Sequence, residues 1–326
     1  MNRLYRDVAG PCLAPRGSVV AIGAFDGVHR GHGTVLAQVQ QRAAARGLMP
    51  VALSFAPIPR VFFARGTAVP QLMATREKIR ALLESGCERL LLLRFDAALA
   101  AMTAEEFVAR VLVRRLGARE VWVGEGFRFG RERAGDVASL RALGERHGFD
   151  VGVVAPLRLD GERVSSSRIR ALLAAGDFDG AARLLGRRFA IGGRVVRGAR
   201  LGHRLGYPTA NLRLGARVAP VGGVFAVRVA GVRPAPMPGV ASLGVRPTVG
   251  GTEPLLEAHL FDFDGELYGK RIEVEFVKKL RDEERFDDLD ALARQIDRDA
   301  AQAREVLAAL GPQPSTLDPQ PSTLSP

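Results

Sequence analysis

The 326-residue sequence has little cysteine and no long apolar run. Its two cysteines, Cys12 and Cys87, lie too far apart to form a local metal-ligand pair, and such sparse cysteine favours a reduced, cytoplasmic setting. No run reaches the roughly 18 apolar residues that a membrane-spanning helix needs. The first residues also lack the continuous apolar core of a signal peptide. We therefore expect a cytoplasmic protein with no membrane partner.

Aromatic residues make up only 6% of the chain, so stacking platforms for single-stranded nucleic acid are scarce. The net charge is +12, and 43 of the 47 basic residues are arginines. A basic balance is typical of nucleic-acid binding, but these arginines are scattered among acidic neighbours instead of forming one tract. We therefore expect phosphate-bearing small molecules as partners, and no nucleic acid.

Length and composition predict a soluble globular protein of two domains. The first half alternates apolar runs with helical patterns, which predicts right-handed βαβ units and a parallel sheet. The predicted strands are residues 19–25, 49–55, 89–94, 120–123 and 150–156. The predicted helices are residues 34–46, 75–85, 103–116 and 136–147, with a closing pair at 167–175 and 177–185. Thr103 and Glu106 have the spacing of a capping box, which marks the start of the third helix.

From about residue 189 the sequence pattern changes to strand-like runs separated by glycine and proline turns. These runs are residues 189–196, 223–229, 239–243, 255–261 and 271–276. Five or six short strands at this spacing predict a small antiparallel barrel. A helix follows, with apolar residues at helical spacing from Leu289 to Leu307. Residues 312–326 repeat the unit Pro-Gln-Pro-Ser-Thr-Leu, which predicts a disordered tail without a function.

Residues 22–36 read Ile-Gly-Ala-Phe-Asp-Gly-Val-His-Arg-Gly-His-Gly-Thr-Val-Leu, a predicted strand that enters a glycine-punctuated turn and then a helix. The first N–H groups of a helix have no intrahelical partner, and the helix dipole favours anions there. His29 and His32 are three residues apart, so they can lie side by side and donate hydrogen bonds into one pocket. The stretch indicates a nucleotide-triphosphate site; a plain turn with two surface histidines is the alternative.

This stretch resembles the Gly-x-Phe-Asp-Gly-x-His-x-Gly-His signature of nucleotidyltransferases that move AMP or CMP from a triphosphate. The matching residues, which the resemblance implies bind ATP, are Gly23, Phe25, Asp26, Gly27, His29, Gly31 and His32. Three further segments resemble one branch, the bacterial bifunctional riboflavin kinase/FAD synthetases. They are residues 55–63, which begin Phe-Ala-Pro-Ile-Pro, residues 124–130, Gly-Glu-Gly-Phe-Arg-Phe-Gly, and residues 164–170, Val-Ser-Ser-Ser-Arg-Ile-Arg. Their occurrence in family order implies a Rossmann-like nucleotidyltransferase domain that adenylylates FMN.

The resemblance also implies roles for individual residues of this first site. His29 and His32 would contact phosphate oxygens as charge builds in the transition state. Arg170 offers a fork of donors suited to the β- and γ-phosphates, with Ser166 and Ser167 supporting the loop.

An apolar slot for the isoalloxazine ring would be formed by Phe55, Phe62 and Phe129 with Pro57. Taken singly, each phenylalanine can instead be a core residue. The chain departs from the family pattern at Ala24, Ile58 and Gly126, where members often carry Asn, His, and an amide or carboxylate. These changes predict slower adenylyl transfer or weaker FMN binding.

Residues 198–211 read Gly-Ala-Arg-Leu-Gly-His-Arg-Leu-Gly-Tyr-Pro-Thr-Ala-Asn. Glycines such as Gly198 and Gly206 suit a loop that closes over phosphates. Thr209 and Asn211 alternate along an extended segment and so project to one side. A hydroxyl and an amide oxygen are hard ligands appropriate to Mg²⁺ carrying ATP phosphates. An ordinary glycine-rich hairpin is the alternative.

The same string resembles the Gly-x-Pro-Thr-Ala-Asn motif of riboflavin kinases, the C-terminal module of the same family. Residues 242–248 and 256–262 resemble the next two landmarks of that module. By this resemblance Glu257 is the general base that takes the proton of the ribityl 5′-hydroxyl; a surface strand charge is the alternative. Arg281 and Phe286, in the family's Arg-Asp-Glu-x-x-Phe segment, would close over the flavin.

Two other segments match known ligand-binding motifs only in part. Residues 265–271 are one spacer residue short of a P-loop and carry arginine where Ser or Thr must hold magnesium. Asp262, Asp264 and Gly265 resemble the start of a calcium loop, but the remaining ligands are missing.

We therefore expect an FMN adenylyltransferase domain over residues 1–186, a riboflavin kinase barrel with a terminal helix over 187–311, and a tail over 312–326. The resemblance implies conversion of riboflavin to FMN and of FMN to FAD, with ATP as co-substrate, Mg²⁺ as cofactor, and a monomer or weak homo-oligomer. One alternative is a riboflavin kinase whose adenylyltransferase domain is weakened. Another is a flavin-sensing or RNA-binding protein without ATP turnover.

Overall fold

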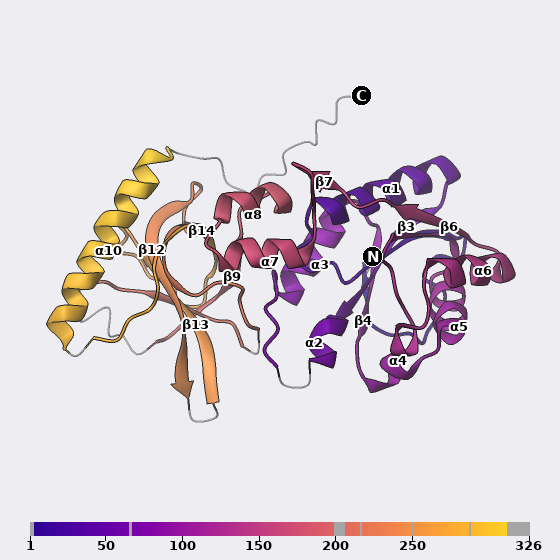
Figure 1. The fold of residues 1–326 in the computed structure, drawn as a ribbon, viewed down its shortest axis with the longest axis horizontal. Helices are drawn as coiled ribbons and strands as arrows, with labels where there is room; N and C mark the ends of the chain where they lie inside the picture. The colour runs from indigo at the N-terminus through magenta and orange to yellow at the C-terminus, as the bar shows by residue number, and fades with distance from the viewer. Residues whose placement is uncertain are drawn as a thin grey trace. The chain divides into compact units, whose positions relative to one another are not determined.

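The computed structural model describes residues 3–64, 67–198, 206–215, 217–248, 251–286 and 288–311, with only the backbone described over 245–248 and 251–253 (Figure 1). The repeated tail and residues 199–205 of the glycine-rich loop lie outside the described residues. The chain divides into two compact units. The first is Met1–Val69 with Thr75–Ser166, and the second is Pro70–Ala74 with Ser167–Pro326.

The first unit is built on a six-stranded sheet with the order β1-β4-β3-β2-β5-β6. Its strands are β1 (Leu4–Tyr5), β2 (Ser18–Ile22), β3 (Met49–Ala56), β4 (Arg89–Arg94), β5 (Ala118–Gly124) and β6 (Asp150–Val154). All neighbours in this sheet pair in parallel, as the sequence predicts. The strands are nearly continuous apolar runs because both faces of the sheet are covered.

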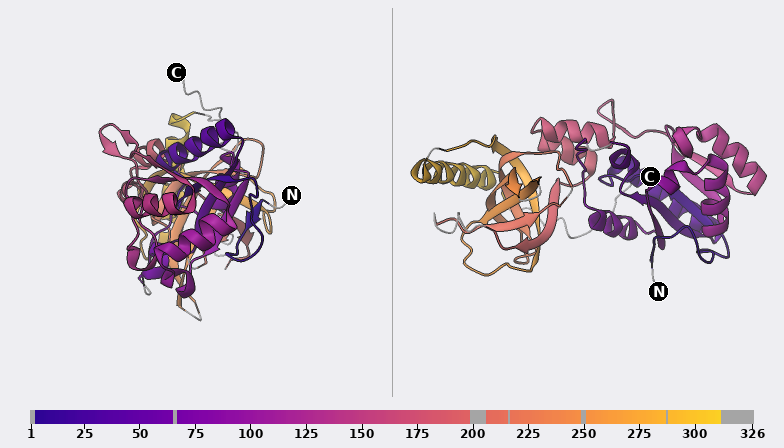
Figure 2. Two further views of the ribbon diagram at one scale, coloured as in Figure 1. Left: turned by 90° about the vertical axis from the view of Figure 1, so that its right-hand side faces the viewer. Right: turned by 90° about the horizontal axis from the view of Figure 1, so that it is seen from below.

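Helices cover both faces of this sheet (Figure 2). The helices of this unit are α1 (Arg30–Arg46), α2 (Pro59–Phe63), α3 (Thr75–Glu84), α4 (Ala97–Ala101), α5 (Ala104–Phe107), the π-helix η1 (Val108–Arg115), the 3₁₀ turn η2 (Arg131–Arg133) and α6 (Val137–His147). Leu36 of α1 and Leu82 of α3 enter one apolar core, and Leu112 of η1 and Leu140 of α6 enter the other. Two cores on opposite faces of a parallel sheet define a doubly wound α/β unit.

Two helices differ from their predicted form. Helix α1 begins at Arg30, four residues before the predicted start, because the His29 ring accepts the backbone N–H of His32 and caps the helix. Histidine is not a usual capping residue, so the sequence carried no start signal there. The capping box of Thr103 and Glu106 is confirmed, but the helix that it starts continues as the π-helix η1.

A short hairpin, β7 (Arg158–Leu159) and β8 (Glu162–Arg163), precedes the helices α7 (Ser166–Ala174) and α8 (Phe178–Leu185). The second unit then forms a closed antiparallel barrel with the order β10-β13-β12-β11-β14-β9. Its strands are β9 (Ala190–Val196), β10 (Ala210–Arg213), β11 (Gly223–Ala230), β12 (Met237–Thr248), β13 (Gly251–Leu260) and β14 (Arg271–Arg281). The predicted barrel is confirmed, and the sixth strand that closes it is the short β10.

The last helix, α10 (Leu289–Ala309), lies along one side of the barrel (Figure 1). Ala300, Ala303 and Leu307 pack against outward-facing residues of β11, including Val224 and Ala226. Among the described residues, no helix combines the length and apolar character that crossing a membrane requires.

Candidate active sites

The sheet of the first unit reverses its strand order at β2. Strands β3 and β4 continue to one side of β2, whereas β5 and β6 lie on the other. Ligands of open α/β sheets bind in the crevice at such a switch point, beyond the carboxyl ends of the strands. The histidine motif follows β2, and residues 125–130 follow β5, so both motifs leave the sheet at this position.

The loop between β2 and α1 has an unusual backbone. Phe25 and Val28 have φ angles of 50° and 38°, and Gly27 has a φ of 86°. Positive φ is uncommon for residues other than glycine and costs roughly 1–3 kcal/mol at each position. The buried Phe25 ring closes over Gly23, where a Cβ would lie 3.0 Å from the ring. Packing therefore holds the loop in a conformation that the chain does not prefer on its own.

The two histidines of this loop stack face to face, with ring centroids 3.7 Å apart and planes 17° from parallel. Because His29 Nδ1 accepts the backbone N–H of His32 at 3.3 Å, a neutral His29 carries its proton on Nε2. Burial lowers the pKa of His32 well below its ordinary value of 6.5, and the positive charges of His29 and Lys78 lower it further. The buried Nδ1 of His32 has no hydrogen-bond partner among the described residues.

A second predicted motif reaches the same loop from far along the sequence. Ser166 Oγ donates a hydrogen bond of 2.8 Å to the backbone carbonyl of Asp26, 140 residues away. A Cβ on Gly31 would lie 3.4 Å from the carbonyl oxygen of Val164, so this segment passes close to the start of α1. Arg170, on α7 in the second unit, donates to Ser167 Oγ at 3.3 Å.

The predicted flavin-binding phenylalanines fall into two ring clusters. Phe55 and Phe62 both contact Phe95, with centroid distances of 5.7 and 5.3 Å. Phe129 instead contacts Phe107 and Phe127, at 5.8 and 5.4 Å. Pro57 lies between β3 and α2, beside the first cluster in sequence.

Phe95 was not predicted from its sequence context, although its position carries a signal. It directly follows β4, which pairs with β3, so Phe55 and Phe95 reach the same edge of the sheet. The neighbouring Phe63 also contacts Phe95 and is 55% exposed, an unusual exposure for a large apolar side chain. Ile58, at the position where family members carry His, is buried.

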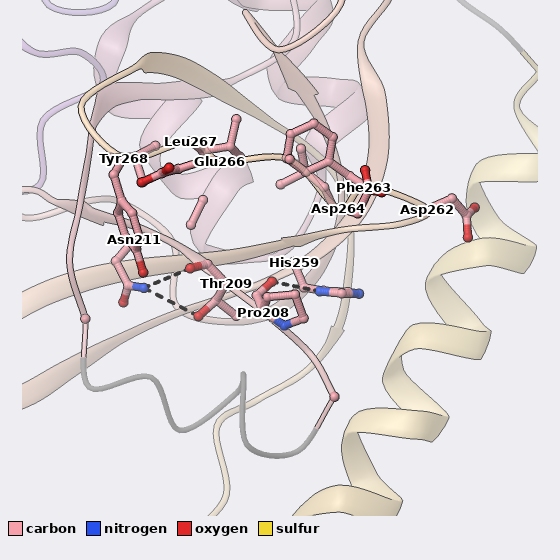
Figure 3. Close-up of a pocket in the computed structure, with 16 residues that line it drawn as sticks. Pro208, Thr209, Asn211, His259, Asp262, Phe263, Asp264, Glu266, Leu267 and Tyr268 are labelled. Carbon is pink, nitrogen blue, oxygen red and sulfur yellow. Dashed lines mark hydrogen bonds between the residues drawn. The ribbon is translucent and has the colours of Figure 1, made fainter.

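The barrel carries a pocket of about 790 Å³ beside β10 (Figure 3). Its lining includes Gly198, Gly206, Thr209, Asn211, His259 and the loop of residues 262–268. Two parts of the glycine-rich motif thus meet at one pocket, together with a loop that follows β13.

Asn211 is 4% exposed, and its amide group contacts Thr209. Its Nδ2 donates to the carbonyl oxygen and to Oγ1 of Thr209, at 3.1 and 3.4 Å (Figure 3). These bonds leave the amide oxygen Oδ1 buried without a hydrogen-bond partner among the described residues. Gly198 packs directly on the amide, since a Cβ there would lie 2.5 Å from Oδ1.

Glu257 lies beside Asn211 because β13 pairs with β10. The two residues are direct partners in the antiparallel register, and Glu257 is also the partner of Ser242 on β12. Direct partners share a face of the sheet, with Cβ atoms about 4.5–5.5 Å apart. The carboxylate and the amide singled out from the sequence are therefore neighbours on one face of the barrel.

Arg281 forms a partly buried ion pair at the end of β14. Its Nε and its terminal nitrogen contact the Asp299 carboxylate of α10 at 2.9 and 2.7 Å, and Gln295 adds a hydrogen bond of 2.8 Å to the same carboxylate. The Phe286 ring lies 5.7 Å from the Arg281 guanidinium. The side chain that the sequence resemblance places over the flavin thus contacts the last helix.

Sequence reasoning missed several contacts in and around the pocket. His259 contacts the carbonyl of Pro208 at 2.9 Å, and Tyr207 donates a hydrogen bond to Asp297 of α10. Asp262 forms a bidentate ion pair with Arg304, whose two terminal nitrogens donate to the carboxylate oxygens at 3.0 and 3.1 Å. The loop that begins at Asp262 contains both partly matching segments, and it lines the pocket without matching either motif.

Comparison with known proteins assigns both units. The family model of FAD synthetase matches residues 13–168, and that of riboflavin kinase matches residues 185–307. A bifunctional riboflavin kinase/FMN adenylyltransferase of Escherichia coli K12 is 43% identical over 311 residues, which cover 95% of this chain and 99% of the relative. The chain belongs to the bifunctional riboflavin kinase/FMN adenylyltransferase family.

A second member of this family, from Pseudomonas fluorescens, is 46% identical over 294 residues, covering 90% of this chain and 94% of the relative. A crystal structure from Streptococcus pneumoniae, named a macrolide-efflux protein, has a TM-score of 0.76 and 29% identity. It covers 92% of this chain and 98% of its own. The presence of both modules in one chain confirms the bifunctional family predicted from the sequence motifs.

Proposed function

We propose that this chain catalyses two successive steps of flavin cofactor synthesis. The kinase module, residues 187–311, transfers the γ-phosphoryl group of ATP to the 5′-hydroxyl of riboflavin, which yields FMN and ADP. The adenylyltransferase module, residues 1–186, transfers AMP from a second ATP to FMN, which yields FAD and pyrophosphate. The observation that carries this proposal is the register that sets Glu257 against Asn211 in a chain that also holds the stacked His29–His32 pair.

In the kinase module, Glu257 accepts the proton of the ribityl hydroxyl. A carboxylate on a barrel strand is held by the sheet, which favours proton transfer to a fixed point. Gly198 and Gly206, which both line the pocket beside β10, adjoin the ATP phosphates. Arg281 and Phe286 lie at the flavin side, with Arg281 acting through its contact to α10.

The residues present fit a magnesium ion. The amide oxygen of Asn211 is buried without a partner among the described residues, and Thr209, whose Oγ1 lies 3.4 Å from the amide nitrogen of Asn211, supplies a second hard oxygen. Among the described residues no three His, Cys, Asp or Glu side chains are grouped to hold a metal. Mg²⁺ is typically held by one or two protein ligands plus substrate phosphates, which suits such a sparse set. When bound, the ion neutralises charge on the transferred phosphoryl group.

In the adenylyltransferase module, the N-terminus of α1 and the stacked histidines receive the triphosphate. His32 is neutral at neutral pH, so it presents a hydrogen bond, and it gains affinity for a proton once phosphate charge arrives. Arg170 and Ser167 hold the β- and γ-phosphates, and Ser166 fixes the loop through Asp26.

The flavin ring of FMN stacks at the phenylalanine side of the same module. Phe55 and Phe62 already form edge-to-face contacts through Phe95, and Pro57 extends this apolar surface. Phe129 borders the site from the loop after β5.

Two single substitutions test the assignment of separate sites. Glu257→Gln should remove FMN formation and leave FMN-to-FAD conversion intact, because it alters only the proton acceptor of the kinase step. His29→Ala should do the reverse. Chromatographic separation of riboflavin, FMN and FAD after incubation with ATP and Mg²⁺ measures both steps. Loss of both activities from one substitution in a folded protein would overturn the assignment, and FMN formation without any FAD would favour a weakened adenylyltransferase.

We further propose that the enzyme acts in the cytoplasm as a monomer or weak homo-oligomer, without nucleic acid. Two free cysteines and the scattered distribution of arginine support this setting. Sedimentation velocity with and without RNA measures the oligomeric state and any RNA binding. Low salt is used because RNA binding would weaken strongly as the salt concentration rises.

A further inference from the structure

Lys78 is a buried lysine that no sequence motif singled out. It is one of only four lysines in the chain, it lies on α3, and it is 4% exposed. Lysine is rarely buried to this extent unless its ammonium group is paired. Its Nζ donates to the backbone carbonyl oxygen of Phe55 at 2.5 Å and to that of Ala24 at 3.2 Å.

These two carbonyls belong to the two segments that the proposed adenylyl transfer brings together. Ala24 lies in the loop after β2, between Gly23 and the strained Phe25. Phe55 lies near the end of β3, in the aromatic cluster assigned to the flavin. One ammonium group therefore joins the nucleotide loop to the flavin strand. The buried Ser54 hydroxyl reinforces this link with a bond of 3.3 Å to the same Ala24 carbonyl.

The charge of Lys78 also faces the functional groups of the loop. Asp26 stabilises the ammonium form, and the ammonium charge in turn disfavours protonation of His32, which stacks on His29. Burial lowers the pKa of Lys78 from 10.5 to about 8. The ammonium is therefore present at neutral pH and is lost within an accessible alkaline range.

We propose that Lys78 is a positioning residue of the adenylyltransferase site, which fixes the loop after β2 against the end of β3. This inference rests on the proposed adenylyl transfer. Lysine suits the task because its compact ammonium reaches two carbonyls at once, whereas the broad guanidinium of arginine needs a planar arrangement of acceptors. Without this link, the FMN phosphate and the α-phosphate of ATP lose their fixed separation.

The first test replaces Lys78 by an apolar side chain of similar length. Lys78→Met should lower kcat for FMN-to-FAD conversion by about 10- to 100-fold, because a misplacement of the order of 1 Å has that effect on a positioned reaction. The KM for ATP should change by less than about threefold, since the histidines and the helix N-terminus remain. Formation of FMN from riboflavin in the same preparation should not change.

The matched control removes a positive charge from the exposed side of the same helix. Arg80 forms a surface ion pair with Glu84, at 3.9 Å, and Arg80→Met should leave kcat for adenylyl transfer unchanged. The single tryptophan of the chain, Trp122, lies on β5 of the same unit, so its fluorescence reports whether that unit is folded. A folded Lys78→Met variant whose kcat lies within twofold of the wild-type value would overturn the inference.

The second test uses pH and remains valid even where Lys78→Met does not fold. Wild-type kcat for adenylyl transfer should fall as pH rises through about 8, the pKa of Lys78, because the ammonium that holds both carbonyls is lost. The arginine of Lys78→Arg keeps its charge at that pH. In this variant the alkaline fall of kcat should therefore lie more than one pH unit higher, and the maximal kcat should be lower than in the wild type. An alkaline fall at the same pH in both enzymes would overturn the inference. A wild-type enzyme that makes FMN but no FAD would overturn the proposed adenylyl transfer instead.

Discussion

At each of the two sites one buried polar atom lacks a partner within the part of the chain that the structure describes. One is Nδ1 of His32, and the other is Oδ1 of Asn211. An unpaired buried polar atom lowers the stability of the folded protein by roughly 1–3 kcal/mol. Such an atom is therefore expected mainly where a bound ligand can pair with it. Both atoms belong to residues that the sequence motifs assign to a ligand. We infer that substrate or ion supplies the missing contact.

Gly198 is the residue that makes the Asn211 arrangement possible. A methyl group there would lie 2.5 Å from Oδ1, so Gly198→Ala should displace the amide. We expect the KM for Mg-ATP in FMN formation to rise at least tenfold, with adenylyl transfer unchanged. Steady-state kinetics of both steps measures this. Gly222→Ala is the control, because its new Cβ meets only ordinary contact, 3.7 Å from the Leu243 carbonyl. Equal kinetics for the two variants would contradict this prediction.

Sequence reasoning identified individual residues where a short motif fixes both chemistry and spacing. The stacked histidines and the Asn211–Glu257 pair follow from such motifs. Lys78 and His259 were not identified because each contacts a backbone carbonyl. Every residue has a backbone carbonyl, so the sequence does not indicate which one a side chain contacts. Their contacts depend on which strands pair, and that information lies in the fold.

At the scale of elements, local signals located the long strands and helices but not their special ends. β10 is only four residues long, too short for a clear alternation, yet it closes the barrel and carries Asn211. The early start of α1 depends on a histidine cap, which general capping preferences do not include. Both departures fall at the proposed sites, where function and local propensity are expected to conflict.

The partly buried pair of Arg281 and Asp299 is one of the contacts between the last helix and the barrel. Asp299→Ala would leave Arg281 without its carboxylate, and we expect the barrel to lose about 3 kcal/mol of stability. This value is at the lower end of the stability losses that follow when one partner of a buried ion pair is removed, because the Arg281 side chain is 18% exposed. Differential scanning calorimetry measures the loss, and thermal inactivation of FMN formation locates it in the barrel.

The control for this experiment is Asp290→Ala, in the exposed first turn of the same helix. Loss of its favourable interaction with the helix dipole should cost less than about 1 kcal/mol. If Asp299→Ala were as stable as this control but had a raised KM for riboflavin, Arg281 would serve the flavin and not the helix.

At the scale of the whole molecule, most residues proposed for the two reactions lie in different units, although Ser167 and Arg170 of the proposed adenylyltransferase site belong to the second unit. His29 and His32 belong to the first unit, whereas Thr209, Asn211 and Glu257 belong to the second. The sequence predicted both architectures because each leaves a strong pattern, a βαβ alternation in one and regularly spaced strands in the other. It could not predict that the segment Pro70–Ala74 joins the second unit, since a parallel bridge between Pro70 and Val218 links residues far apart in sequence.

This division predicts that two damaged enzymes can complement each other in one solution. Glu257→Gln retains the groups of adenylyl transfer, and His29→Ala retains those of phosphoryl transfer. A mixture of the two, supplied with riboflavin, ATP and Mg²⁺, should form FAD after a lag in which FMN accumulates, because FMN must diffuse from one molecule to the other. Dilution should lengthen the lag, whereas the wild-type lag should change less. Each variant alone should give no FAD from riboflavin. If the mixture also gave none while each variant kept its own step, FMN would have to pass within a single chain, and the two sites would not be independent.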